Sequence, residues 1–260
     1  MRLDRALRDA RERGDPIVLP YLVVDRARQA GLSATVRALR AAGATGLELG
    51  FPFSDPIADG PVLEAASDRA LRRGTRWEDL RRAARAATVH LPAAVMTYAN
   101  PVLRHGRERA LVELVSDGLS GLIVPDLSLE EAAPWRQASE RAGISLVLMA
   151  APGGSEERVR SIAKASRGFL YVVSRYGTTG RSGAGSAVNL APIVRAARRA
   201  APDLPVLVGF GIRDRETAGR ALGFGADGVV VGSALEEAIA RDPDPEAVGK
   251  WFAALVPRPR

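Results

Sequence analysis

The chain alternates between two patterns of apolar residues along its whole length. Short runs rich in Val, Ile and Leu predict β-strands. Each is followed by a longer stretch in which apolar residues recur every three to four positions, as in an amphipathic helix. Strands that are apolar throughout, each followed by a helix, are typical of a parallel sheet covered by helices. The eight predicted strands are 17–24, 46–49, 93–97, 120–124, 144–149, 168–173, 205–208 and 227–231.

The number of strand and helix pairs indicates the architecture. Eight such units in 260 residues favour a closed (β/α)8 TIM barrel over a doubly wound open sheet, which would need fewer strands. No linker rich in Pro, Gly or Ser divides the chain, so we expect residues 1–260 to form a single TIM-barrel domain, with 257–260 as a frayed tail. The predicted helices include 1–14, 32–42, 107–116, 132–142, 159–165 and 193–200.

The scarcity of some residue types excludes several kinds of site. The chain has no cysteine, which excludes disulfides and thiolate ligands, and its only imidazoles are His90 and His105, so we expect no metal. Lys164 and Lys250 fall in predicted helices, whereas a Schiff-base aldolase needs a lysine at a strand end facing the pocket. We therefore expect carboxylates to act as the catalytic groups.

The formal charge of +7 raises the possibility of nucleic-acid binding. The arginines recur at spacings typical of solvated helix faces, and no aromatic residues interleave with them to form a stacking platform. A patch that binds polyanions is the alternative interpretation. The first residues lack the apolar core of a signal peptide, and no apolar run approaches the ~20 residues of a membrane span. We therefore expect a cytoplasmic enzyme that binds neither nucleic acid nor membrane.

Two carboxylates stand near the end of the second predicted strand. Glu48 interrupts an apolar strand, and alternation points its side chain into the barrel while Leu47 and Leu49 face the helices. Burial raises the pKa of a carboxyl towards the range of a general acid or base. Asp59 follows in the next loop. A structural carboxylate at Glu48 and an ordinary Asp-Gly turn at Asp59 are the alternatives.

Glycines follow three of the later strands. Residues 174–186 form a long glycine-rich loop that could close over a ligand, with a loop of no function as the alternative. Gly209 and Gly211 follow the seventh strand, and Gly232 and Ser233 follow the eighth, where a helix begins. Glycines let backbone N–H groups approach an anion, and TIM barrels often bind phosphate between these two strand ends. We therefore expect an enzyme that acts on a phosphorylated metabolite.

Several longer motifs carry a family resemblance that extends over nearly the whole chain. The sequence resembles the tryptophan synthase α subunits, the indole-3-glycerol-phosphate lyases. Residues 47–60 (LELGFPFSDPIADG) agree with the family motif position by position. Further matches, in family order, are 96–101 (MTYANP), 124–127 (VPDL), 171–180 (YVVSRYGTTG), 209–212 (GFGI) and 232–234 (GSA).

The resemblance implies a retro-aldol cleavage of indole-3-glycerol phosphate to indole and glyceraldehyde 3-phosphate in tryptophan biosynthesis. By position, Glu48 protonates the indole C3 and then takes a proton from the glycerol hydroxyl, Asp59 holds the indole N–H, and Tyr171 helps to place Glu48. Phosphate binding falls to Gly180, Gly211, Gly232 and Ser233. The indole pocket falls to Tyr21, Met96, Ile123, Met149 and Phe210, and the closing loop to Arg175 and Thr179.

The resemblance also implies a partner. The α subunit itself holds no cofactor, and pyridoxal phosphate belongs to a β subunit that receives the indole. Pro52, Asp55, Pro56 and Asn100, which in the family lie towards that subunit, are all present. The first loop departs from the family pattern, because Asp25 and Arg26 stand where a Gly-Asp-Pro turn is usual. The two remaining alternatives are a stand-alone lyase that supplies indole to another pathway and a non-catalytic phosphate-binding barrel.

Overall fold

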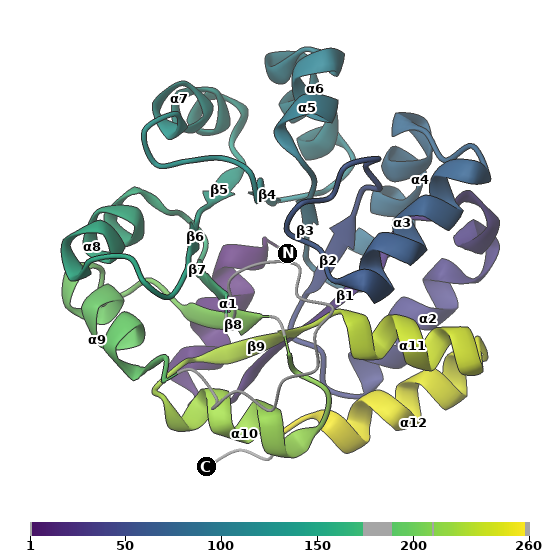
Figure 1. Cartoon of the computed structure of the whole chain (residues 1–260). Coiled ribbons are helices and arrows are strands. Elements are labelled where there is room, and N and C mark those ends of the chain that lie inside the picture. Colours follow the sequence, from purple (N-terminus) through teal and green to yellow (C-terminus); the bar gives the residue numbers. More distant parts are fainter. Residues whose placement is uncertain (1, 174–188, 210, 258–260) are drawn as a thin grey trace.

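The strands form one parallel sheet that curls into a barrel. A computed structural model describes residues 2–173, 189–209 and 211–257. The strands lie in the order β5-β4-β3-β2-β1-β9-β8-β7-β6, with helices around them (Figure 1). Their bounds are β1 Ile17–Val23, β2 Leu47–Gly50, β3 Ala93–Met96, β4 Gly121–Ile123, β5 Ser145–Val147, β6 Met149–Ala150, β7 Leu170–Val173, β8 Val206–Gly209 and β9 Gly228–Val231.

β5 and β6 are the two halves of one predicted strand, 144–149, interrupted at Leu148. β5 pairs with β4 and β6 pairs with β7, so the interrupted strand closes the ring. At the interruption, the Leu148 N–H donates to the Ser166 hydroxyl at 3.0 Å, and its carbonyl accepts from the Tyr171 N–H at 3.1 Å. Both backbone groups thus remain bonded without a regular ladder. The predicted eight-stranded TIM barrel is confirmed.

The helices follow the predicted alternation, with additions. α3 and α4 both follow β2, and α5 and α6 both follow β3. The N-terminal helix covers Leu3–Glu12 of the predicted 1–14. Pro257, expected to begin a frayed tail, is buried, and 258–260 lie outside the described residues. The remaining bounds are η1 Arg26–Arg28, α2 Gln29–Ala41, α3 Pro61–Arg72, α4 Trp77–Thr88, α5 Ala99–His105, α6 Arg107–Ser116, α7 Ala132–Ala142, α8 Glu156–Ala165, α9 Ala191–Ala200, α10 Arg215–Gly223, α11 Ser233–Arg241 and α12 Pro245–Leu255.

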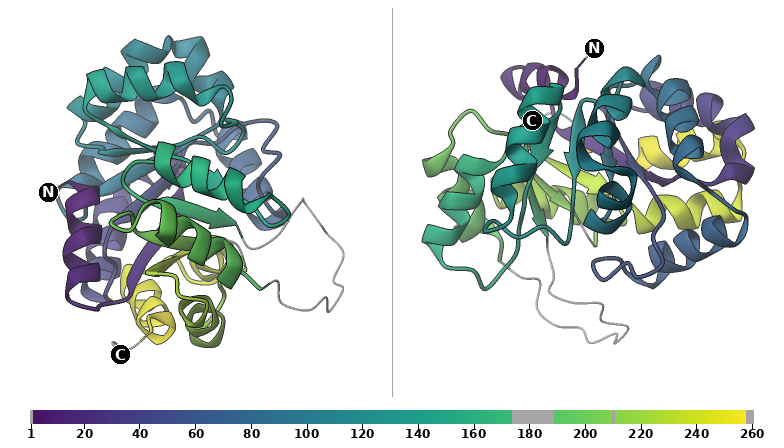
Figure 2. Two further views of the ribbon diagram at one scale, coloured as in Figure 1. Left: turned by 90° about the vertical axis from the view of Figure 1, so that its left-hand side faces the viewer. Right: turned by 90° about the horizontal axis from the view of Figure 1, so that it is seen from above.

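Two apolar clusters hold the barrel together. The outer cluster, which includes Leu47 and Leu49, fills the space between strands and helices. The inner cluster fills the barrel with inward-facing strand residues such as Leu19 and Phe169, together with Leu7 of α1. α1 lies across the end of the barrel where the strands begin (Figure 2). α1 thus covers the end where the strands begin, and the carboxyl ends of the strands are left for a site.

Many arginines pair with acidic residues on the same helix surface. Arg5 lies 3.8 Å from Asp9, Arg72 lies 2.7 Å from Asp68, and all four side chains are substantially exposed. The predicted solvated helix faces account for these arginines. No helix in the described part of the chain is long and apolar enough to cross a membrane.

The first loop, which departs from the family pattern, is held by two buried carboxylates. One Asp25 oxygen caps η1 by accepting from the Ala27 N–H at 2.9 Å, and the other accepts from Arg73 at 2.6 Å. Glu236, on α11, accepts from the Val23 N–H at 2.9 Å and from Arg28 at 2.6 Å. A short 3-10 helix with charged anchors thus stands in place of the expected turn.

We expect Arg28→Met to lower the free energy of unfolding by about 2–3 kcal/mol, because it leaves the Glu236 carboxylate unpaired where only 1% of the side chain is exposed. Adding Glu236→Gln should recover most of the loss, since an amide oxygen can still accept from the Val23 N–H. Denaturant unfolding measures both. Arg5→Met, which removes the exposed pair with Asp9, is the control, and an equal loss in the two arginine variants would contradict the expectation.

Candidate active site

Glu48 lies in the barrel interior, as strand alternation predicts. Its Cα stands in register with Tyr21 on β1 and with Ala94 on β3, while its neighbours Leu47 and Leu49 belong to the outer cluster. The side chain is fully buried. Neither carboxyl oxygen has a hydrogen-bond partner among the described residues. Burial, and then the charge of Asp59, raise the pKa of Glu48 from 4.5 to about 8. The carboxyl is therefore mostly protonated at neutral pH.

Asp59 lies in the loop between β2 and α3 and is 3% exposed. Its N–H donates to the Pro56 carbonyl at 2.9 Å, which fixes the turn. Burial, followed by the nearby charge of Glu64, raises the pKa of Asp59 to about 7, and a hydrogen bond from the Tyr98 hydroxyl opposes the rise. The Tyr98 oxygen also accepts from the Ala58 N–H at 3.0 Å. Tyr98 therefore positions Asp59, a role that sequence reasoning missed.

Two tyrosines stand over glycines at strand ends. A Cβ atom at Gly50 would overlap the Tyr21 phenol, and one at Gly209 would overlap the Tyr171 phenol. Only glycine leaves room for these rings. Burial, and then the charges of Glu48 and Asp59, raise the pKa of both tyrosines above the ordinary value of 10, so both stay neutral hydrogen-bonding groups.

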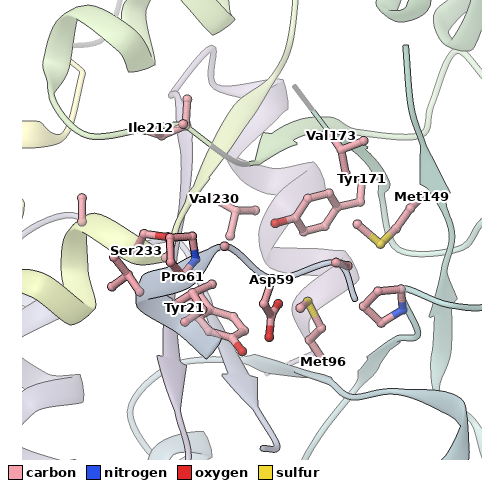
Figure 3. Close-up of a pocket in the computed structure, with 18 of the residues that line it drawn as sticks. Tyr21, Asp59, Pro61, Met96, Met149, Tyr171, Val173, Ile212, Val230 and Ser233 are labelled. Carbon is pink, nitrogen blue, oxygen red and sulfur yellow. The ribbon is translucent and has the colours of Figure 1, made fainter. Parts of the chain in front are cut away.

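A cavity of about 720 Å³ opens at the ends of the strands. In Figure 3, Asp59 lies between Tyr21 and Met96, the Tyr171 hydroxyl points towards the middle, and Ser233 lies on the opposite side. This volume is ample for a small metabolite. The predicted site residues that line the cavity are Tyr21, Asp59, Met96, Met149, Tyr171, Gly211, Gly232 and Ser233.

Two predicted site residues lie behind the wall of the cavity. Glu48 and Ile123 are both fully buried and do not line it. Ile123 is enclosed in the inner cluster, and its place in the wall of the pocket stays a prediction. The other predicted residues, Arg175, Thr179, Gly180 and Phe210, lie outside the described residues.

The corner formed by the last two strands suits an anion. Gly211 has φ +79°, a conformation that favours glycine, and it lines the cavity together with Gly232 and Ser233. Ser233 begins α11, and the first turn of a helix offers backbone N–H groups and a partial positive charge. Among the described residues, no group of three or more His, Asp or Glu side chains could hold a metal ion.

Comparisons with known proteins agree with this geometry. Residues 7–252 match the family model described as "Tryptophan synthase alpha chain". The chain belongs to the tryptophan synthase alpha chain family. A curated relative of that name from Methanosarcina mazei is 40% identical over 238 residues, which cover 91% of this chain and 86% of the relative.

Solved structures of the same family share the fold. One is tryptophan synthase from Mycobacterium tuberculosis, with 35% identity, a TM-score of 0.86 and 98% of each chain covered. Another is from Pyrococcus furiosus, with 32% identity, a TM-score of 0.78, and 92% of this chain and 95% of that one covered. Its title describes mutual activation of the tryptophan synthase a2b2 complex. The predicted membership of the tryptophan synthase alpha chain family is confirmed.

The site in this member of the family contains residues that sequence reasoning did not assign. Tyr98 lies within the predicted 96–101 motif, just after the third predicted strand, and that position was the available signal. Arg213 and Glu237 line the cavity, and both are exposed. Arg213 lies two residues after Gly211, and Glu237 lies four residues after Ser233. No motif in the sequence identified either of them as a site residue.

The raised pKa of Glu48 predicts a change in stability with pH. An unfolded glutamate loses its proton near pH 4.5, whereas the buried one keeps it to about pH 8, so the folded chain binds the extra proton between these values. Stability therefore falls as pH rises through this window. Glu48→Gln should gain stability relative to the parent chain by about 5 kcal/mol as pH rises from 4.5 to 8, since each pH unit between the two pKa values corresponds to about 1.4 kcal/mol.

Denaturant unfolding at several pH values measures this gain. Glu246→Gln, at a residue whose side chain is 77% exposed, is the control and should show no such trend. Parallel stability curves for Glu48→Gln and the parent chain would contradict the prediction.

Proposed function

We propose that this chain cleaves indole-3-glycerol phosphate to indole and glyceraldehyde 3-phosphate, as the alpha subunit of a tryptophan synthase. The observation that carries the assignment of the site is the pair of buried carboxyls, Glu48 and Asp59, with pKa values of about 8 and 7, beside a cavity in which Asp59 lies on the side opposite Ser233. Membership of the alpha chain family supports the reaction. No cofactor on this chain takes part.

The two carboxyls have separate tasks in the proposed reaction. Asp59 accepts a hydrogen bond from the indole N–H, and this contact favours its ionised form. Protonated Glu48 gives its proton to the indole C3, which yields the indolenine as its N-protonated cation, and the Asp59 carboxylate stabilises that N–H cation. Glu48, now a carboxylate, takes the proton of the glycerol hydroxyl while the carbon–carbon bond breaks and its electron pair returns to the ring. Glu48 thus regains its proton, and a pKa near neutrality suits both directions of transfer.

Glu48 reaches the substrate in this proposal by turning its side chain from behind the wall into the cavity. Tyr21, Met96 and Tyr171 line the adjacent part of the cavity and are the side chains that must give way. The absence of a hydrogen-bond partner for the Glu48 oxygens among the described residues means that no such bond holds the carboxyl in its buried position. Tyr171 then serves as the neutral hydroxyl that places it.

The phosphate of the substrate binds between Gly211 and Ser233, through backbone N–H groups and the Ser233 hydroxyl. Gly180 belongs to the same proposed subsite, Phe210 to the indole pocket, and Arg175 and Thr179 to the closing loop, by their positions in the family motif. The indole ring lies between Tyr21, Met96 and Met149. This orientation places the reacting bond near the carboxyl pair and the phosphate near the start of α11.

The partner in this proposal is a tryptophan synthase beta subunit that carries pyridoxal phosphate and receives the indole. The loop after β2 supports a contact surface, because Asp55 and the apolar Ile57 are exposed, with Ile57 at 69%. Asn100 is exposed on α5, whereas Pro52 is buried and supports the loop from below. A cytoplasmic location belongs to the same proposal, as the setting of this biosynthetic reaction.

Indole release from indole-3-glycerol phosphate tests the reaction and the roles of the two carboxyls. Glu48→Gln and Asp59→Asn should each lower kcat by at least about 100-fold, because each removes a proton acceptor or donor while keeping the shape of the side chain. Glu246→Gln is the matched exposed control. A non-catalytic barrel predicts no indole from the parent chain, and unchanged turnover in either variant would remove that carboxyl from the mechanism.

The same assay repeated with a tryptophan synthase beta subunit tests the partner. An alpha subunit should turn over at least several times faster with the partner present, and the two chains should elute together in size-exclusion chromatography. A fast reaction that the beta subunit neither accelerates nor binds would instead assign a stand-alone lyase.

A further inference from the structure

The charges that line the cavity are unbalanced for a phosphorylated substrate. Among the described lining residues, the acidic side chains are Asp59 and Glu237, and Arg213 is the only cationic one. Glu48 adds a third carboxyl behind the wall. A phosphate monoester that enters such a cavity is repelled by every ionised carboxylate, so its binding is favoured by a cation at the corner where it binds.

Arg213 lies at that corner. It is two residues after Gly211, and Gly211, Arg213, Gly232 and Ser233 all line the same cavity. The backbone at Arg213 is held in place, because its N–H donates to the Thr217 hydroxyl at 3.0 Å. The start of α10 thus fixes the backbone that carries this side chain.

The carboxylate next to Arg213 in the sequence, Asp214, is engaged at the start of α10 through one of its two oxygens. Asp214 caps α10, and its Oδ1 accepts from both the Thr217 N–H and the Thr217 hydroxyl at 2.8 Å. These hydrogen bonds are the main reason that the pKa of Asp214 is low, and the charge of Arg213 is the least of the causes. Within the described part of the chain, Arg213 forms no ion pair, whereas Arg5, Arg8 and Arg220 pair with acids of their own helices.

We propose that Arg213 binds the phosphate group of the substrate and supplies the positive charge that the backbone donors of Gly211 and Ser233 lack. The inference rests on the proposed function and adds a side-chain ligand to its phosphate subsite. The guanidinium presents several N–H donors in a fixed plane, which match the oxygens of a phosphate monoester. Because Arg213 contacts the end of the substrate that does not react, it acts on affinity and leaves the chemical step to Glu48 and Asp59.

The test measures the affinity of the intact chain for sn-glycerol 3-phosphate by isothermal titration calorimetry. Arg213→Gln should weaken binding by about tenfold, as expected for the loss of a charged hydrogen bond at an exposed position. The affinity of Arg213→Lys should lie between those of Arg213→Gln and the parent chain, because the charge remains but the planar donor set is lost. The dependence of the Kd on salt should also become shallower in Arg213→Gln. Indole, which has no phosphate, should bind both chains equally.

Arg215→Gln is the matched control. Arg215 lies two residues further on, is exposed, and donates to the Ala253 carbonyl instead of lining the cavity. Its variant should bind sn-glycerol 3-phosphate like the parent chain. Equal affinities of Arg213→Gln and the parent would overturn the proposal. Equal losses of affinity in Arg213→Gln and Arg215→Gln would also overturn it, because they would indicate a general electrostatic effect of positive charge. An absence of binding by the parent chain would overturn it as well.

Kinetics separate this inference from the proposed function. If the reaction is as proposed, Arg213→Gln raises the KM for indole-3-glycerol phosphate about tenfold and leaves kcat within about twofold. If the parent chain releases no indole while its affinity for sn-glycerol 3-phosphate depends on Arg213, the proposed reaction fails and the phosphate ligand stands. If indole is released with a KM and a Kd that are independent of Arg213, the reaction stands and the ligand fails.

Discussion

The rest of the site depends on one costly arrangement, a carboxyl buried inside the barrel without a hydrogen-bond partner among the described residues. Glu48 avoids most of the cost of burying a charge by keeping its proton near neutral pH. The apolar inner cluster both creates the low-dielectric surroundings and contributes the stability that offsets them. The two phenols that stand over glycines belong to the same arrangement, because they close the barrel above Glu48 without bringing a second charge.

The two ends of the barrel therefore differ in the kinds of side chain that they contain. Where the strands begin, Leu3 and Leu7 of α1 join the inner cluster, and the Leu3 N–H donates to the buried Ser120 hydroxyl at 2.9 Å. Where the strands end, polar groups line a cavity. Asp59 lies on one side of it and Ser233, at the start of α11, on the opposite side, and Arg213 and Glu237 also belong to the lining. A substrate with an aromatic N–H at one end and a phosphate at the other fits this polarity.

The sequence predicted the barrel well because its evidence is local. Apolar runs define strands to within a few residues, and alternation alone pointed Glu48 inward. Contacts between segments that are far apart in the sequence were not predicted. Arg28 and Glu236 are 208 positions apart and meet only because β1 pairs with β9 to close the ring. Ile123 points inward as alternation requires, but its distance from the cavity depends on how the neighbouring side chains pack. The role of Tyr98 depends on a hydrogen bond across two loops, which no periodicity reveals.

The charged anchors of the first loop also limit how pieces of this chain can be exchanged with relatives. A chimera that receives the usual Gly-Asp-Pro turn in place of residues 25–27 would lose the cap of η1, and with it the placement of Arg28 above Glu236. The carboxylate on α11 would then lie buried beside the start of the helix to which the phosphate binding is assigned. The first loop and α11 thus depend on each other, although they lie near opposite ends of the sequence. Recombination between family members therefore has to carry both segments or neither.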